Sequence, residues 1–198
     1  MRTSLLAASL LFITSTLVSQ AASGWMTDYE AAAKKSKETG KPILANFTGS
    51  DWCGWCIKLH KEVFNKAEFK TWAEENVVLL ELDYPRRKKL DAEIKKQNGE
   101  LKKKYAIRGF PTVLLLDAEG KKIGKTGYRK GGPQGWTEHA QSLIDYYDKE
   151  GQSLQDALPK KSGRIEGKLI SKDDKEMVIE TPDGKRIRIP LKMVKEKK

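Results

Sequence analysis

Apolar residues follow two different spacings along the chain, and these spacings predict short strands alternating with helices. Residues 43–47 (I-L-A-N-F) and 77–83 (V-V-L-L-E-L-D) are continuous apolar runs of strand length. After Cys53 the apolar residues recur every three or four positions as far as Phe64, which predicts a helix with Cys53 at its N-terminus. Further helices are expected at 27–37, at 67–75 and from Pro133 onward. Residues 84–106 are expected to be helical, with a break at Asn98-Gly99. Two more strands are expected, one at 113–117 and one ending near Tyr128.

The order of these elements places the main part of the chain in the α/β class. The order is helix, strand, cysteine-containing helix, strand, helix, strand, strand, helix. A further short helix at 67–75 lies between the cysteine-containing helix and the second strand. Thr27 followed by Glu30 predicts a capping box at the start of the first helix. Gly40 and Pro42 then predict its end.

The first 23 residues have the layout of a secretory signal peptide, with Arg2, an apolar run from Leu5 to Val18, and small residues ending at Ser23. The run is shorter than the roughly 20 apolar residues that a membrane span needs. Cleavage after Ala21 is expected, and an uncleaved anchor is the alternative. The mature protein is therefore expected to be periplasmic or secreted, where disulfides persist.

The C-terminal part has a different pattern. We expect four regions: a signal peptide at 1–23, a main domain at 24–150, a polar linker at 151–162, and a small β module with a basic tail at 163–198. Apolar and polar residues alternate in the module, and turn residues at 173–174 and 182–184 divide it into a three-strand antiparallel meander. Three strands are marginal alone, so the meander is expected to pack on the main domain or on a partner.

Composition narrows the functional classes. Hydrophobic residues make up 38% and charged residues 33% of the chain, which is typical of a soluble globular protein. The net charge is +11, but the basic residues are mostly lysines scattered among acidic ones. Without an arginine-aromatic cluster or a known motif, this charge indicates a solvated surface, and no nucleic-acid partner is expected.

The only two cysteines, Cys53 and Cys56, could form a structural strut, a metal site or a redox centre. A bridge that closes so short a loop would stabilise the fold by ~2 kcal/mol at most. Structural zinc normally takes four ligands, and only His60 and His139 could add imidazoles. No metal site is therefore expected. The redox interpretation remains, and it needs a suitable fold around the pair.

That fold is indicated by a resemblance to the thioredoxin family, whose central mixed sheet is flanked by helices. The residues that carry it are W-C-G-W-C at 52–56, K-P-I-L-A-N-F at 41–47, the strand ending at Asp83, and G-F-P-T at 109–112. The resemblance covers residues 24 to about 150. Pro111 matches the cis-proline that faces the active disulfide in that family. Among its members, the chain looks most like secreted or periplasmic proteins that carry a lysine at the position of Lys58.

The resemblance implies a thiol-disulfide oxidoreductase that exchanges disulfides with protein substrates and needs no cofactor. A helix N-terminus offers unsatisfied N–H groups and a partial positive charge, which stabilise a thiolate. Cys53 is therefore expected to be the nucleophile and Cys56 the resolving thiol of the redox disulfide. The family likeness favours reductase or electron-transfer duty over oxidase duty, with recharging by a membrane electron donor.

The substrate is expected to dock beside the disulfide. Pro111 has no N–H, so the backbone opposite the sulfurs stays open to an extended segment. The side chains expected to contact the substrate are Trp52, Trp55, Phe110 and Thr112.

Three departures from cytosolic thioredoxin affect these expectations. Gly-Trp stands between the cysteines instead of Gly-Pro, the loop before Trp52 is one residue longer, and Asn46 falls near the place of a buried acid that deprotonates the second thiol. If Asn46 replaces that acid, another group or water must take the proton.

Two other functions remain open: a non-catalytic binding module that acts through the C-terminal β module, and metal delivery by Cys53, Cys56 and His60.

Overall fold

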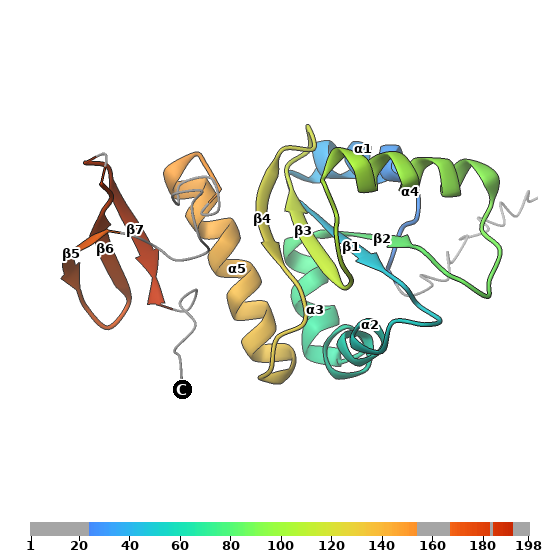
Figure 1. Ribbon diagram of the computed structural model, residues 1–198, viewed down its shortest axis with the longest axis horizontal. Helices are drawn as coiled ribbons and strands as arrows, with labels where there is room; N and C mark the ends of the chain where they lie inside the picture. Colours follow the sequence, from blue (N-terminus) through green and yellow to red (C-terminus); the bar gives the residue numbers. More distant parts are fainter. Residues whose placement is uncertain (1–23, 154–166, 183, 192–198) are drawn as a thin grey trace, which may run out of the picture.

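The chain forms two β-sheets with helices packed mainly around the first (Figure 1). The computed structural model describes residues 24–153, 167–182 and 184–191. Its first part contains α1 (Tyr29–Thr39), β1 (Ile43–Thr48), α2 (Gly54–Leu59), η1 (His60–Phe64), α3 (Ala67–Asn76), β2 (Val78–Asp83), α4 (Ala92–Lys104), β3 (Thr112–Leu116), β4 (Lys122–Thr126) and α5 (Gly132–Glu150). The second part contains β5 (Lys168–Lys172), β6 (Glu176–Glu180) and β7 (Arg186–Pro190).

The first sheet has the strand order β2-β1-β3-β4. β1 is parallel to β2 and antiparallel to β3, and β3 is antiparallel to β4. The parallel pair needs a crossover, which α2, η1 and α3 supply. This mixed sheet confirms the expected α/β fold, and it places the loop after β1 beside the loop after β2.

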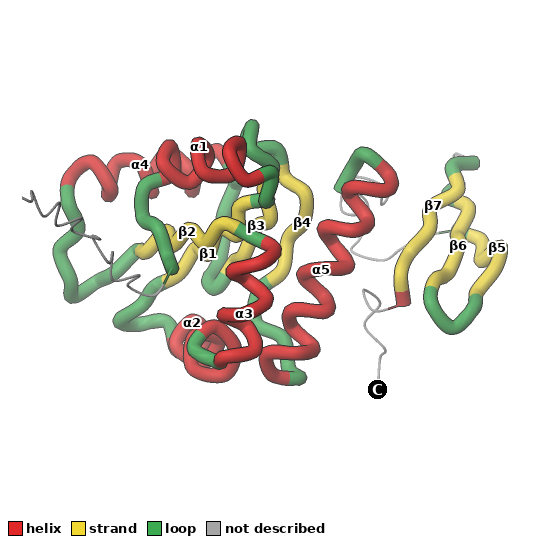
Figure 2. The backbone as a smooth tube through the Cα atoms, turned by 180° about the vertical axis from the view of Figure 1, so that it is seen from behind, coloured by secondary structure: helices red, strands yellow, loops and turns green. Residues whose placement is uncertain are grey.

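The central strands are buried on both faces because helices cover each side of the first sheet (Figure 2). Alternate residues of a strand point to opposite faces, so the strands contribute to two separate cores. One core joins the sheet to α1 and α4 and includes Ala32, Ala45, Phe47, Leu80, Leu101 and Leu114. The other joins it to α2, η1, α3 and α5 and includes Leu44, Leu59, Phe64, Phe69, Leu115 and Trp136.

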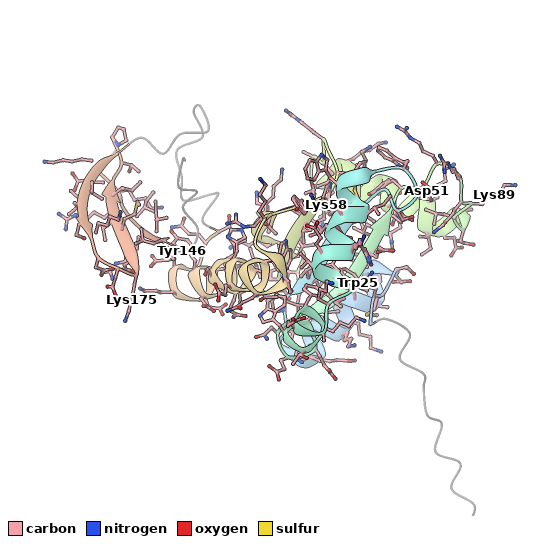
Figure 3. All side chains as sticks on the ribbon, turned by 90° about the horizontal axis from the view of Figure 1, so that it is seen from below. Trp25, Asp51, Lys58, Lys89, Tyr146 and Lys175 are labelled. Carbon is pink, nitrogen blue, oxygen red and sulfur yellow. A yellow bond between two sulfur atoms is a disulfide. The ribbon has the colours of Figure 1, made fainter. Side chains whose placement is uncertain are left out.

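The second sheet is a three-strand antiparallel meander in the order β5-β6-β7. Its buried face packs on the end of α5, where Tyr146 joins Ile179, Ile187 and Ile189 in one small cluster. Figure 3 shows Tyr146 at the end of the helix that faces this sheet. An ion pair of 3.9 Å between Lys149 and Glu176 adds a polar contact. The expected meander is therefore present, and it packs on the main domain.

Two expected helix boundaries were wrong. Asp28, not Thr27, caps α1, and its side chain accepts a hydrogen bond from the N–H of Ala31. Asn98-Gly99 does not break a helix, because α4 runs through both residues. The side chain of buried Asn98 donates to the carbonyl of Asp83, so tertiary contact keeps this weak helix former in place.

Several expectations concern residues outside the described part. These are the signal peptide at 1–23, most of the linker at 151–162, and the ends of the β module at 163–166 and 192–198. Among the helices that the structure describes, none combines the length and the apolar character needed to cross a bilayer.

Candidate active site

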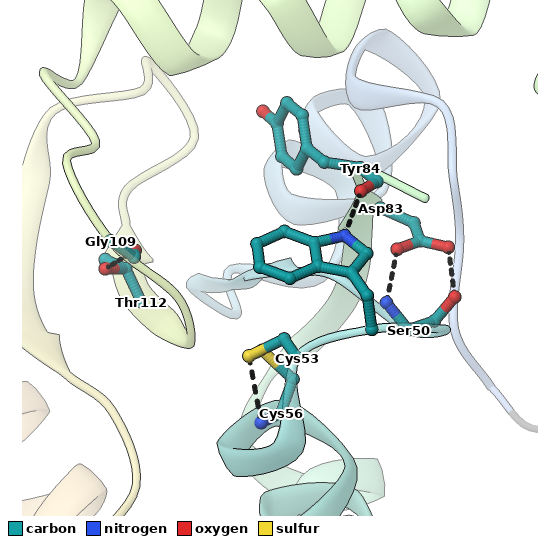
Figure 4. Close-up of a disulfide and its surroundings, with 8 residues drawn as sticks. Ser50, Cys53, Cys56, Asp83, Tyr84, Gly109 and Thr112 are labelled. Carbon is teal, nitrogen blue, oxygen red and sulfur yellow. Dashed lines mark hydrogen bonds between the residues drawn. A yellow bond between two sulfur atoms is a disulfide. The ribbon is translucent and has the colours of Figure 1, made fainter. Parts of the chain in front are cut away.

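The two cysteines form a disulfide at the point where the loop after β1 turns into α2 (Figure 4). Cys53 is the N-cap residue of α2, and its Sγ accepts a hydrogen bond of 3.2 Å from the N–H of Cys56. The same N–H would stabilise a thiolate at Cys53 once the disulfide opens. Cys53 is 7% exposed and Cys56 is 3% exposed, so Cys53 is the more accessible of the two cysteines.

Residues 49–52 hold this turn against the end of β2. Ser50 bonds the carboxylate of Asp83 through both its N–H and its hydroxyl, at 2.9 and 2.6 Å. The indole of Trp52 donates to the carbonyl of Tyr84 at 2.8 Å. Gly49 is needed here because a Cβ atom would lie 2.6 Å from the Trp52 ring. The loops after the two parallel strands therefore fix the position of Cys53 together.

The predicted docking proline lies in the loop before β3. The peptide bond between Phe110 and Pro111 is cis. Phe110 contacts the Trp52 ring edge-on, with the ring centroids 5.8 Å apart, so this loop meets the residue next to Cys53. Thr112 is buried, and its hydroxyl donates to the carbonyl of Gly109 at 2.8 Å. Thr112 thus stabilises the proline loop, and its predicted contact with substrate stays a prediction.

Three aromatic rings near the disulfide, one exposed and two partly buried, have cations above them. Trp55 is 57% exposed, with the Lys58 ammonium 5.3 Å from its ring centroid. The guanidinium of Arg86 lies 3.9 Å from the Trp52 ring, and the Lys102 ammonium lies 5.3 Å from the Phe110 ring. These contacts keep the apolar faces oriented and add positive charge beside the disulfide.

Asp51 organises the loop after β2, which carries Arg86. Its carboxylate accepts hydrogen bonds from the N–H groups of Arg86, Arg87 and Lys88 at 2.7 to 3.2 Å. The N–H of Arg86 is the main reason that the pKa of Asp51 lies below its usual value. The carboxylate therefore stays charged and anchors the loop.

A cavity of about 410 Å³ lies behind the second cysteine. It is lined by Trp25, Thr48, Ser50, Cys56, Ile57, His60, Lys61, Phe64, Asn65, Lys70 and Glu81. His60 Nε2 lies 3.3 Å from Oε2 of Glu81, and this hydrogen bond is the main reason that the pKa of His60 lies above its usual value. His60 thus pairs with a carboxylate, and the described residues contain no cluster of three or more candidate metal ligands.

Comparison with known proteins agrees with this geometry. Residues 29–132 match the model of the thioredoxin-like domain. The chain belongs to the thioredoxin-like family. It is 37% identical over 116 residues to "Disulfide bond reductase DsbH" of Chlamydia pneumoniae, covering 59% of this chain and 70% of that protein. It is also 38% identical over 103 residues to "Thioredoxin-related protein DsbJ" of the same organism, covering 52% of this chain and 30% of that protein.

A solved structure supports the same assignment. The structure titled "DsbH Oxidoreductase" superposes with a TM-score of 0.59 at 36% identity, over 61% of this chain and 83% of that one. With its disulfide at a helix N-terminus, the thioredoxin-like chain is a thiol-disulfide oxidoreductase. The matched domain, 29–132, ends before the second sheet begins.

Glu81, Tyr84 and Arg86 were not predicted as site residues. Each lies in β2 or directly after it, and β2 is the parallel neighbour of β1. The carboxyl ends of parallel strands meet at one edge of a sheet, so the residues after Asp83 could have been assigned to the site.

Proposed function

We propose that the protein reduces disulfides in protein substrates outside the cytoplasm. The observation that carries this proposal is the position of Cys53 as N-cap of α2, with its sulfur already accepting an N–H bond. Similarity to a protein named as a disulfide bond reductase supports the reductive direction. The apolar signal-like segment at 1–23 supports export.

The reaction begins with the reduced protein. The Cys53 thiolate attacks one sulfur of the substrate disulfide, a mixed disulfide forms, and the other substrate sulfur leaves as a thiolate. Cys56 then attacks Cys53, which closes the protein disulfide and releases the second substrate sulfur. The substrate gains two electrons and the protein loses two. A dithiol of a membrane protein on the same side of the membrane would return the protein to its reduced form.

The substrate would lie along the proline loop. Pro111 leaves the backbone opposite the sulfurs without an N–H, so an extended segment could pair there. Trp52, Trp55 and Phe110 would provide apolar walls, and Thr112 would keep the loop in shape. The cations over the walls favour substrates with acidic residues near the disulfide.

Insulin reduction tests the proposed chemistry. The wild-type protein should reduce insulin with a dithiol donor, and Cys53→Ser should lose this activity. Cys56→Ser should lose turnover but accumulate a mixed disulfide with substrate, because Cys53 still attacks. Insulin reduction that persists in Cys53→Ser would remove the proposed mechanism.

The direction and the location need separate measurements. The equilibrium constant with glutathione should place the protein among reductants, and a potential as oxidising as that of a strong disulfide donor would contradict the reductase assignment. Cell fractionation of the full chain and of a chain lacking residues 1–23 tests export. Equal amounts of both outside the cytoplasm would contradict the proposed signal peptide.

A further inference from the structure

The second thiol has to lose a proton before it can attack. A free cysteine has a pKa near 8.5, and apolar burial raises it. Cys56 is only 3% exposed, so at neutral pH most of it would keep its proton without a nearby acceptor. The buried polar side chains of β1 on the α2 side are those of Asn46 and Thr48, which are neutral and cannot serve as a base.

One carboxylate of the cavity is available for this proton. Glu81 faces Asn46 across the β1–β2 pair, and it lines the same cavity as Cys56. Asp83, two residues further along β2, is engaged by two hydrogen bonds from Ser50. Among the described residues, the side chain of Glu81 has a hydrogen bond only through Oε2. Its other oxygen, Oε1, is therefore available to solvent in the cavity.

His60 holds Glu81 in this position. Its Nε2 lies 3.3 Å from Oε2 of Glu81, and its Nδ1 lies 3.2 Å from Oδ1 of Asn65. Both neighbours accept hydrogen bonds, so the ring satisfies both when it carries both protons. The direction of the pKa shift at His60 agrees with a charged ring.

The other charged residues that line the cavity are basic, and the carboxylate of Asp83 outside it also raises the pKa of His60. Lys61 from η1 and Lys70 from α3 line the cavity and are exposed. Their positive charge beside the cavity favours a thiolate at Cys56.

We propose that Glu81 accepts the proton of Cys56 through solvent in this cavity, and that His60 is the positioning residue that holds the carboxylate there. This proposal rests on the order of attack given under the proposed function. In the step, the Cys56 S–H bond breaks and its proton passes to Glu81. The Cys56 sulfur bonds Cys53, and the substrate sulfur leaves with the electron pair of the mixed disulfide.

The resolving step can be measured directly with an aromatic disulfide reagent. Reduced protein attacks the reagent through Cys53 and releases one coloured thiolate, and attack by Cys56 then releases a second. The rate of the second release reports the resolving step, followed by stopped flow between about pH 6 and pH 9. The first release checks that each variant is folded and that Cys53 reacts normally.

Glu81→Gln is expected to slow the second release at least about tenfold near pH 6, which is less than the roughly hundredfold of a directly positioned base because this proton passes through solvent. The loss should shrink to less than about twofold near pH 9, because the fraction of Cys56 thiolate that forms without a base rises with pH. His60→Gln should show a smaller loss with the same dependence on pH. Glu68→Gln is the matched control, because Glu68 is an exposed carboxylate on α3 that does not line the cavity, and its rates should equal those of the wild type.

Two results would overturn the proposal. A Glu81→Gln variant as fast as the control at every pH would show that bulk solvent takes the proton. A loss that is equal near pH 6 and pH 9 would assign Glu81 a structural role only.

This test is independent of the proposed direction of the reaction. A protein that fails to reduce insulin but shows the pH-dependent loss in Glu81→Gln would refute the proposed function and support the proton acceptor. A protein that reduces insulin, but whose Glu81→Gln variant shows no pH-dependent loss, would support the proposed function and refute the proton acceptor.

Discussion

The two sheets of this molecule are built from strands of similar length, but they are buried to very different degrees. Every residue of β1 and β3 is buried, whereas every residue of β5 is exposed. Helices cover both faces of the first sheet, and the second sheet has contact with one helix end. The residues of the candidate site come from the loops and the helix attached to the first sheet. The difference indicates that a site with fixed sulfur geometry requires the doubly covered scaffold, and that the second sheet is an attachment to it.

The largest expected effect comes from opening the core of the first sheet. Phe47 is fully buried and contacts Tyr84 and Tyr105. Phe47→Ala should lower the free energy of unfolding by about 3–5 kcal/mol, from lost burial and the cavity that remains. Denaturant unfolding measures this loss. Trp55→Ala removes a larger but exposed ring, so it serves as control and should change stability by less than about 1 kcal/mol. Equal losses in the two variants would contradict the role of the doubly covered core.

A smaller effect is expected when the second sheet loses its anchor. Ile187 is 2% exposed in the cluster with Tyr146. Ile187→Ala should cost about 2 kcal/mol, and the loss should be confined to β5–β7. Hydrogen exchange should be faster in those strands and unchanged in β1 and β3, with normal insulin reduction. Faster exchange in both sheets would show that the two unfold as one unit.

A still smaller effect is expected from the partly buried pair of His60 and Glu81. The pKa of His60 is raised from 6.5, mainly by the hydrogen bond with Glu81. The stability that the pair contributes is therefore fully present below about pH 6.5 and is lost as the pH rises through the raised value. His60→Gln should destabilise the protein at low pH by no more than about 1 kcal/mol, since the side chain is 34% exposed, and by less at high pH. Unfolding curves at two pH values test this, and a constant difference would contradict it.

The smallest effect is expected on the exposed strand. Leu169 in β5 is 55% exposed, so Leu169→Thr removes little buried apolar surface and keeps a residue that suits a strand. Stability should change by less than about 0.5 kcal/mol. A larger loss in thermal unfolding of the full chain would show that this face is covered in solution.

The sequence pattern predicted the strands and the cysteine helix, the family resemblance implied the mixed sheet and the redox disulfide, and neither predicted the contacts around them. Apolar runs and the Cys-x-x-Cys spacing predicted β1, β2 and a helix starting at Cys53, because burial and helix periodicity are local properties. The continuous path of α4 through Asn98 depends on a bond to the carbonyl of Asp83, which only the folded chain brings near. The widened turn of η1, where the N–H of Asn65 reaches the carbonyl of His60, also has no signature in the sequence.

His60 illustrates the same limit within the site. Its spacing from Cys56 suggested a metal ligand as one alternative. Parallel pairing of β1 and β2 instead brings Glu81 to its ring. Asp51, two residues before Cys53, is the anchor of residues 86–88. The two carboxylates thus have different partners: Glu81 binds an imidazole, and Asp51 binds the backbone of a neighbouring loop.

The shared helix α5 sets a fixed spacing within the molecule. Trp136 near its start packs against Phe64, just after the cysteine helix, and Tyr146 near its end packs into the second sheet. A helix of 19 residues is about 28 Å long at 1.5 Å per residue. The ten residues from Trp136 to Tyr146 span about 15 Å along the helix axis, so α5 separates the point where the second sheet is attached from the helices that follow Cys53.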